Sequence, residues 1–443
     1  MKKNSIIILI YSLVLFVCAN CFTVVIKAPW LFVIVALLLM IINVYTYLPQ
    51  KEFQSFRIKA CAHAQLRLSA FFISCVASIV YQTFSETHLL SANLKLWIVS
   101  IIYCVLVNMF VFFNGIITAY CSSLQLGLKL RIVGVVFGII PIVNIFILIK
   151  IISVLANEVE IETEKAKLNR ARKKDRVCAT KYPILFVHGV FFRDSKYFNY
   201  WGRIPNELER NGATCHYGNH QSALSVADCA DELTARIKDI VKNTGCEKVN
   251  IIAHSKGGLD CRYAISFCGA APYIASLTTI NSPHRGCKFA DYLLDRIPKK
   301  VQNKIADTYN RALRNFGDED PDFMAAVTDL TDEACVERNK IMPITDCDGI
   351  YTQSVGSKLN RAANGTFPMN FTYYIAKAFG GENDGLVSKD SFEWGENYTY
   401  LTTNGKRGIS HGDMVDLNRE NIKGFDVREF YVSLVSDLKN RGL

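Results

Sequence analysis

The stretch Val249-Asn250-Ile251-Ile252-Ala253-His254-Ser255-Lys256-Gly257-Gly258 decides the fold of the larger part of this 443-residue chain. Residues 249–253 form a run that is apolar except for Asn250, which predicts a strand buried on both faces of a sheet. A similar run at 184–187 precedes His188-Gly189, and residues 227–241 between the two runs have apolar side chains at helical spacing. A strand, a helix and a strand in this order predict a parallel sheet covered by helices, which is an α/β domain.

The turn after the second run has the pattern of a nucleophile elbow. In such an elbow a serine occupies a strained turn between strand and helix, and the residues two positions before and after it are small. Ala253 and Gly257 meet that requirement around Ser255. The pattern therefore predicts Ser255 as a nucleophile, and an ordinary serine at a helix start is the alternative.

A serine nucleophile needs a base and an orienting acid, which follow it in that fold in the order acid, then histidine. His284 follows the predicted strand 277–280 too closely to leave room for the acid, so His411 is the base by elimination. The acids considered between nucleophile and base are Asp346, Asp348, Glu382, Asp384 and Asp390. Asp384 fits best, because it lies in the glycine-rich turn 380–385. A surface histidine and a structural turn aspartate are the alternatives.

Acyl transfer also needs two N–H donors for the oxyanion, and the loss of one costs about 3–4 kcal/mol of transition-state stabilisation. The backbone N–H of Lys256, directly after the serine, is the first expected donor. The second is the backbone N–H of Val190, after the His188-Gly189 turn. Because backbone groups do this work, the side chains at these two positions are free to vary.

Several separated motifs resemble bacterial triacylglycerol lipases of the pseudomonad type, which have the α/β-hydrolase fold with a mostly parallel sheet. The resemblance extends over about residues 182–438 and is carried by Pro183 to Gly189, Tyr200 to Pro205, Lys248 to Gly258, Ser282 to Gly286, Asn383 to Val387 and His411-x-Asp413. It implies a catalytic triad of Ser255, Asp384 and His411 and a helical lid at about 289–342. It also implies hydrolysis of the carboxylic esters of lipids.

The same resemblance implies a calcium site made of Asp413 and a second aspartate upstream of the acid loop. That upstream stretch, residues 355–367, contains no acid. We therefore expect that no cofactor is required, and calcium at Asp413 stays open as an alternative.

The net charge of +10 is distributed unevenly along the chain. Residues 1–155 carry 11 Lys and Arg against 2 acids, residues 156–176 carry 7 against 5, and residues 177–443 carry 32 against 33. The cations of the first part separate long apolar runs, which indicates membrane topology and disfavours a nucleic-acid partner. We expect an all-α membrane region (1–155), a charged helical linker (156–176) and an α/β-hydrolase domain (177–443).

The first part holds apolar segments long enough to cross about 30 Å of hydrocarbon. There are five, at about Ile6–Ile26, Trp30–Leu48, Leu68–Phe84, Leu96–Ala119 and Ile132–Leu155. They predict a multi-pass integral membrane protein of the cell membrane. The 15 cysteines have no repeated spacing, so we expect buried thiols rather than a disulfide framework.

The sequence allows the hydrolase domain to lie on either side of the membrane. Lys51, Arg57, Lys59 and Arg67 put the N-terminus in the cytoplasm by the positive-inside rule, and five crossings then place the domain outside. The seven bases of the linker argue for the inside. A hairpin at Gly138, Pro141 and Asn144 would return the chain to the first side, whereas a single kinked span would not.

Together these patterns predict a membrane-anchored serine hydrolase that cleaves carboxylic esters of lipids. The expected partners are a membrane lipid or acylglycerol substrate and the bilayer, with no nucleic acid, and no protein partner is predicted. A phospholipase, an acyltransferase or a thioesterase on the same triad is an alternative, as is an inactive hydrolase fold that serves as a membrane scaffold or sensor.

Overall fold

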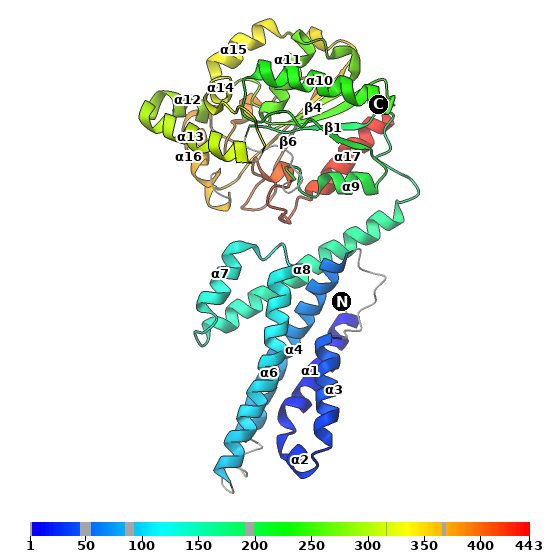
Figure 1. The fold of residues 1–443 in the computed structure, drawn as a ribbon, viewed down its shortest axis with the longest axis vertical. Helices are drawn as coiled ribbons and strands as arrows, with labels where there is room; N and C mark the ends of the chain where they lie inside the picture. Colours follow the sequence, from blue (N-terminus) through cyan, green and yellow to red (C-terminus); the bar gives the residue numbers. More distant parts are fainter. Residues whose placement is uncertain (1, 45–54, 85–92, 191–198, 316, 366–368) are drawn as a thin grey trace. The chain divides into compact units, whose positions relative to one another are not determined.

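The computed structural model of the protein describes residues 2–44, 55–84, 93–190, 199–315, 317–365 and 369–443. The chain forms two compact units, residues 1–171 and residues 172–443. Figure 1 labels the helices and strands of the two units.

The first unit is entirely helical in its described part. Its helices are α1 (Lys2–Asn20), α2 (Phe22–Lys27), α3 (Leu31–Val44), α4 (Phe56–Phe84), α6 (Leu94–Ser122), α7 (Gly127–Phe137) and α8 (Val143–Ala171). Two of them, α4 and α6, are long and apolar enough to cross a membrane, and two stretches in shorter helices, Ser5–Asn20 and Leu31–Val44, are also apolar. The end of the second expected segment, residues 45–48, lies outside the described residues.

Two of the five expected segments are not single helices. The first is interrupted at Cys21, between α1 and α2. The last is divided at residues 138–142, where Ile142 has a φ of 68° that ends the helical path. Gly138 and Pro141 lie in this break, as the hairpin alternative requires, whereas Asn144 already lies in the first turn of α8.

Polar side chains lie inside this unit, and apolar side chains cover its outside. Asn20 Nδ2 donates to Ser78 Oγ over 2.8 Å, and Gln82 Nε2 donates to Asn20 Oδ1 over 3.1 Å. On α6, in contrast, Leu106 and Ile117 are exposed. Apolar surfaces and polar helix contacts in this arrangement are typical of helices packed within a lipid bilayer.

Helix α8 continues from the last apolar segment through most of the expected linker, to Ala171. Glu158, near the start of that linker, is fully buried and pairs with Arg57 of α4. Its Oε2 also accepts a hydrogen bond of 2.5 Å from Ser123 Oγ, in the turn between α6 and α7. This carboxylate therefore joins α8 to both neighbouring segments.

The second unit contains a sheet of six parallel strands in the order β2-β1-β3-β4-β5-β6. The strands are β1 (Ile184–Val187), β2 (Cys215–Tyr217), β3 (Val249–His254), β4 (Ile274–Ile280), β5 (Tyr351–Ser357) and β6 (Asn397–Leu401). The quoted apolar run forms β3, which pairs with β1 and β4 at the centre of the sheet. The predicted α/β architecture is confirmed, and its carboxyl edge carries the turn at Ser255.

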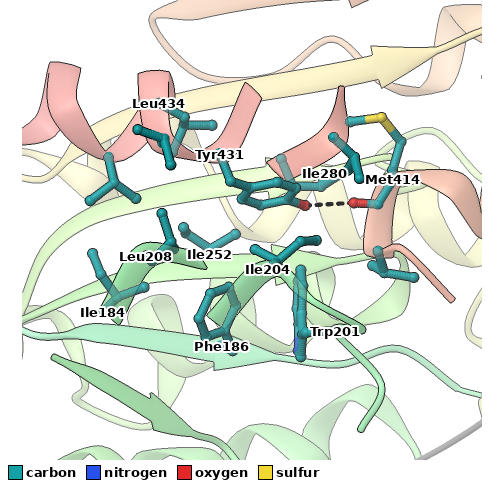
Figure 2. Packing of buried hydrophobic residues seen from close by; sticks show 14 of the residues in the cluster. Ile184, Phe186, Trp201, Ile204, Leu208, Ile252, Ile280, Met414, Tyr431 and Leu434 are labelled. Carbon is teal, nitrogen blue, oxygen red and sulfur yellow. Dashed lines mark hydrogen bonds between the residues drawn. The ribbon is translucent and has the colours of Figure 1, made fainter. Parts of the chain in front are cut away.

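Helices cover both faces of the sheet. On one face, Ile184 and Phe186 of β1 pack with α9 (Ile204–Arg210) and α17 (Val427–Asn440). Figure 2 shows this cluster, in which the buried Tyr431 donates a hydrogen bond of 2.9 Å to the carbonyl of Met414. Leu185 and Val187 point to the opposite face, because side chains alternate along a strand.

The opposite face is covered by α10 (Val226–Thr244) and α11 (Lys256–Phe267). Helix α10 begins where the side chain of Ser225 accepts a hydrogen bond from the backbone of Asp228. It ends at Gly245, whose φ of 71° lies in the left-handed region that glycine adopts without strain.

Four helices connect β4 to β5 and occupy the stretch where a lid is expected. They are α12 (Lys288–Arg296), α13 (Lys299–Asn315), α14 (Phe323–Thr328) and α15 (Asp332–Ile341). A further helix, α16 (Met369–Gly380), lies beyond that stretch and packs against α12. Leu293, Ala306 and Phe323 form an apolar cluster that joins α12, α13 and α14.

Candidate active site

Ser255 lies at a sharp turn between β3 and α11. Its φ of 55° and ψ of −131° are strained for a residue with a side chain, and they are the backbone conformation that a nucleophile elbow needs. Small neighbours make the turn possible. A Cβ on Gly257 would lie 2.4 Å from the carbonyl oxygen of His188, and one on Gly189 would lie 2.8 Å from Cβ of Ser255.

His411 and Asp384 form a direct pair. His411 Nδ1 lies 2.6 Å from Asp384 Oδ2, and the backbone N–H of His411 donates to the carbonyl of Asp384 over 2.8 Å. The Asp384 carboxylate is fully buried and accepts three further hydrogen bonds, from Asn281 Nδ2 (2.7 Å) and from the N–H groups of Leu386 (2.9 Å) and Val387 (2.8 Å). These donors fix the carboxylate, which in turn fixes the orientation of the imidazole ring.

Ser255 and His411 open onto the same cavity, of about 280 Å³. Its walls are largely apolar and come from the lid region and from the loops after the strands. The lining residues include Phe289, Leu293, Ile305, Tyr309, Phe323, Met369, Leu386, Val415 and Leu417. Ser255 and His411 therefore face a chamber that suits an apolar group.

The two expected oxyanion donors lie on either side of the serine. Lys256 follows it directly as the first residue of α11, and Val190 follows Gly189, the residue that contacts Ser255. Both residues are buried. Residues 191–198 lie outside the described part of the chain, so the loop that continues from Val190 is not described.

A second set of hydrogen bonds, which the sequence analysis missed, ties these loops together. Tyr200 Oη accepts from the N–H of Gly189 (3.2 Å) and lies 2.6 Å from His254 Nδ1. His254 Nε2 lies 3.2 Å from the carbonyl of His411. Burial lowers the pKa of His254 well below its usual range, so the ring is neutral, with Nδ1 accepting from the tyrosine and Nε2 donating.

The Lys256 side chain enters a buried polar cluster beneath the elbow. Its ammonium group donates to Asp260 Oδ1 over 2.7 Å, and both side chains are almost completely buried. His220, Cys229 and Asp260 place one potential metal ligand each within 4.8 Å of one another. The lysine already supplies a cation at this cluster, and burial raises the pKa of the Cys229 thiol to about 12, so the cluster does not fit a metal ion.

Asp413 does not fit the calcium site that the resemblance implied. Arg407 Nη2 lies 3.0 Å from its Oδ1, and the N–H of Ser410 donates to its Oδ2 over 2.8 Å. A guanidinium group occupies the side of the carboxylate that a cation would need, and calcium requires six to eight oxygen ligands. Asp413 instead orients the loop that carries His411.

The close approach at Gly257 allows a test of the elbow's packing. We expect Gly257→Ala to lower the free energy of unfolding by about 1–3 kcal/mol, because the added Cβ meets backbone rather than a flexible side chain. Gly405→Ala is the matched control, since the nearest atom to its added Cβ lies 3.6 Å away. Chemical denaturation would measure both variants, and equal midpoints would show that the elbow is not tightly packed.

Comparisons with known proteins find sequence similarity in the second unit. The family model for palmitoyl protein thioesterase matches residues 183–320. Triacylglycerol lipases of Pseudarthrobacter phenanthrenivorans and Burkholderia plantarii are each 34% identical over 182 residues, which is 38% of this chain and 56% and 50% of theirs. The chain thus spans about half the length of these relatives. The mature lipase BlEst2 of Bacillus licheniformis is 20% identical, with a TM-score of 0.44, over 58% of this chain and 92% of that chain. The sequence similarities support a lipase-type α/β-hydrolase.

Proposed function

We propose that the chain is a serine hydrolase that cleaves carboxylic esters of lipids. The observation that carries this proposal is the meeting of the Ser255 elbow and the His411–Asp384 pair at one apolar cavity. An apolar chamber beside the nucleophile suits an acyl chain, and the similarity to triacylglycerol lipases supports the same substrate class.

In the proposed reaction, Ser255 Oγ attacks the ester carbonyl while His411 Nε2 takes the hydroxyl proton. The backbone N–H groups of Val190 and Lys256 hold the oxyanion of the tetrahedral intermediate. Collapse of this intermediate expels the alcohol, which leaves with the proton from His411. A water molecule then attacks the acyl-enzyme by the same sequence and releases the fatty acid and free Ser255. Asp384 orients the imidazole and stabilises its cation without taking the proton.

A fluorophosphonate probe tests the elbow, the base and the oxyanion hole together. We expect stoichiometric labelling of the full chain in detergent, at the peptide that contains Ser255, as identified by mass spectrometry. A heat-denatured sample is the control, since labelling requires the assembled site. Absence of labelling in the folded protein would favour the inactive scaffold or sensor instead.

A thioesterase is the second candidate, and the palmitoyl protein thioesterase match over residues 183–320 favours it specifically. The same serine, histidine and aspartate would serve either reaction. Rates on a palmitoyl thioester and on a palmitoyl oxygen ester, measured with one preparation, separate the two. We expect the oxygen ester to have the larger kcat/KM, and a tenfold preference for the thioester would reverse the assignment.

We also propose that the first unit is a multi-pass anchor in the cell membrane, with the bilayer as a partner of the protein. Its polar interior and apolar exterior support this, beyond the length of α4 and α6. The break between α7 and α8 favours the hairpin, which leaves four crossings and puts the hydrolase unit in the cytoplasm. Protease added to right-side-out vesicles is expected to spare that unit, and its digestion from the outside would refute the hairpin.

A further inference from the structure

Three helices of the second unit surround the catalytic cavity and also present an outer surface. Leu293 of α12, Ile305 of α13 and Met369 of α16 line the cavity. Helix α12 packs against both of the others. In Figure 1 the three helices lie together at one side of the sheet. Any partner of their outer faces would therefore lie next to the site.

The outer face of α13 carries a concentration of positive charge. Residues 288–315 hold seven Lys and Arg against three acids, in a unit whose charges otherwise nearly cancel. Lys299, Lys300 and Lys304 are exposed in the first part of α13, and its first turn contains no acid. Cations at a helix N-terminus oppose the helix dipole, so these lysines do not serve the stability of the helix.

Aromatic side chains are exposed on α16. Phe371, Tyr374 and Phe379 are 64%, 65% and 55% exposed, respectively, although the opposite side of this helix is buried against the unit. Exposure of large aromatic side chains to water is unfavourable, and patches of such side chains on a protein surface often mark an interaction site. They are favoured where a ring can lie at the boundary between lipid headgroups and acyl chains.

We propose that an anionic lipid surface docks on this part of the molecule, at a docking face made of Lys299, Lys300, Lys304, Phe371 and Tyr374. The lysines complement negatively charged headgroups, and the aromatic rings enter the interface beneath them. The purpose of such docking rests on the proposed function, because it would bring the cavity onto its lipid substrate. The acids nearest to these lysines in the sequence are Asp295 and Asp307, and residues 295–307 still hold four Lys and Arg against these two acids.

Lysine labelling of the unaltered full chain tests the docking. The protein is placed in nanodiscs of phosphatidylcholine, with or without 30% phosphatidylglycerol, and is treated with a water-soluble acetylating reagent. Mass spectrometry then gives the rate at each lysine. We expect Lys299, Lys300 and Lys304 to react about fivefold more slowly in the anionic discs, which is the effect of about 1 kcal/mol per lysine. High salt should abolish this protection.

Exposed Lys238 and Lys242 of α10 are the internal controls, since they lie on a helix that does not line the cavity. A Phe371→Ser/Tyr374→Ser variant should lose most of the protection if the rings anchor the contact. Equal labelling in the two kinds of disc would overturn the proposal. Protection in lipid-free detergent that grows with protein concentration would also overturn it, because a second copy of the chain would then cover the face.

The same samples are assayed on a soluble short-chain ester, which needs no docking. Protection without ester hydrolysis would leave the docking standing and contradict the proposed function. Ester hydrolysis with equal labelling in both discs would leave the proposed function standing and overturn the docking.

Discussion

Ser255→Ala is expected to lower kcat/KM for a soluble p-nitrophenyl ester by about 10⁴-fold or more, because no acyl-enzyme can form without the hydroxyl group. The remaining activity would come from the oxyanion donors and the cavity, which the substitution leaves in place. Steady-state kinetics with the full chain in detergent would measure the loss. The backbone of the elbow accommodates alanine as well as serine, so the fold should be retained.

Two comparisons make this test specific. Ser433 on α17 is exposed, and its change to alanine should leave the rate unaltered. His411→Ala should cost nearly as much as Ser255→Ala, and the double variant little more, because residues that act as a unit are strongly non-additive. If Ser255→Ala retained more than a tenth of the parental rate, the hydrolysis would have to come from another group.

The sequence was sufficient to predict those parts of the site that depend on local pattern. The elbow at Ser255 follows from an apolar strand with small residues at fixed distances, which is information contained in about ten positions. The pairing of Asp384 with His411 could be predicted because the order of these residues in an α/β sheet is constrained by topology. The structure pairs these two residues and brings His411 to the cavity that Ser255 lines.

The supporting contacts could not be predicted in this way. Tyr200 and His254 form a hydrogen bond although they lie 54 positions apart in the sequence. Asn281 and Asp384 lie 103 positions apart and also form a hydrogen bond. Such contacts depend on how the strands are ordered and on where each loop turns back, which no local pattern records. Asn281 has a φ of 48°, a left-handed conformation that asparagine adopts more readily than most residues with a side chain, but no sequence pattern places it at this position.

The same limit applies to the boundaries of the expected parts. The apolar pattern ends at Leu155 and predicts a separate linker from residue 156. Helix α8 runs through this position without a break, because a helix continues as long as its backbone hydrogen bonds do, whether its side chains are apolar or charged. The partly exposed Arg57 pairs with the fully buried carboxylate of Glu158, whose burial without a partner would be unfavourable.

The buried pair of Lys256 and Asp260 explains why a charged residue is tolerated directly after the nucleophile. Burial alone would disfavour the ammonium group, but the neighbouring Asp260 carboxylate outweighs this effect and raises the pKa of Lys256. Burial raises the pKa of Asp260, whose second oxygen lies 3.7 Å from His220 Nε2. The pair is therefore stable only while both partners are present, and each charge would be uncompensated without the other.

Lys256→Met is accordingly expected to lower the free energy of unfolding by about 3–5 kcal/mol, since it leaves the Asp260 carboxylate buried without its cation. Lys256→Met/Asp260→Leu should recover most of that loss, because two apolar groups of similar size replace the two charges. In the single variant the pKa of Asp260 in the folded state should rise further above its pKa in the unfolded state, because the neighbouring cation is gone. The folded protein then binds the proton more tightly, so its stability should fall as pH rises above about 4.

Denaturant unfolding followed by tryptophan fluorescence, with Trp201 and Trp394 in this unit, would measure both effects. Lys238→Met on the exposed face of α10 makes the same chemical change without burial and should be nearly neutral. A single variant as stable as the double variant would mean that Asp260 is not held as a buried anion by Lys256.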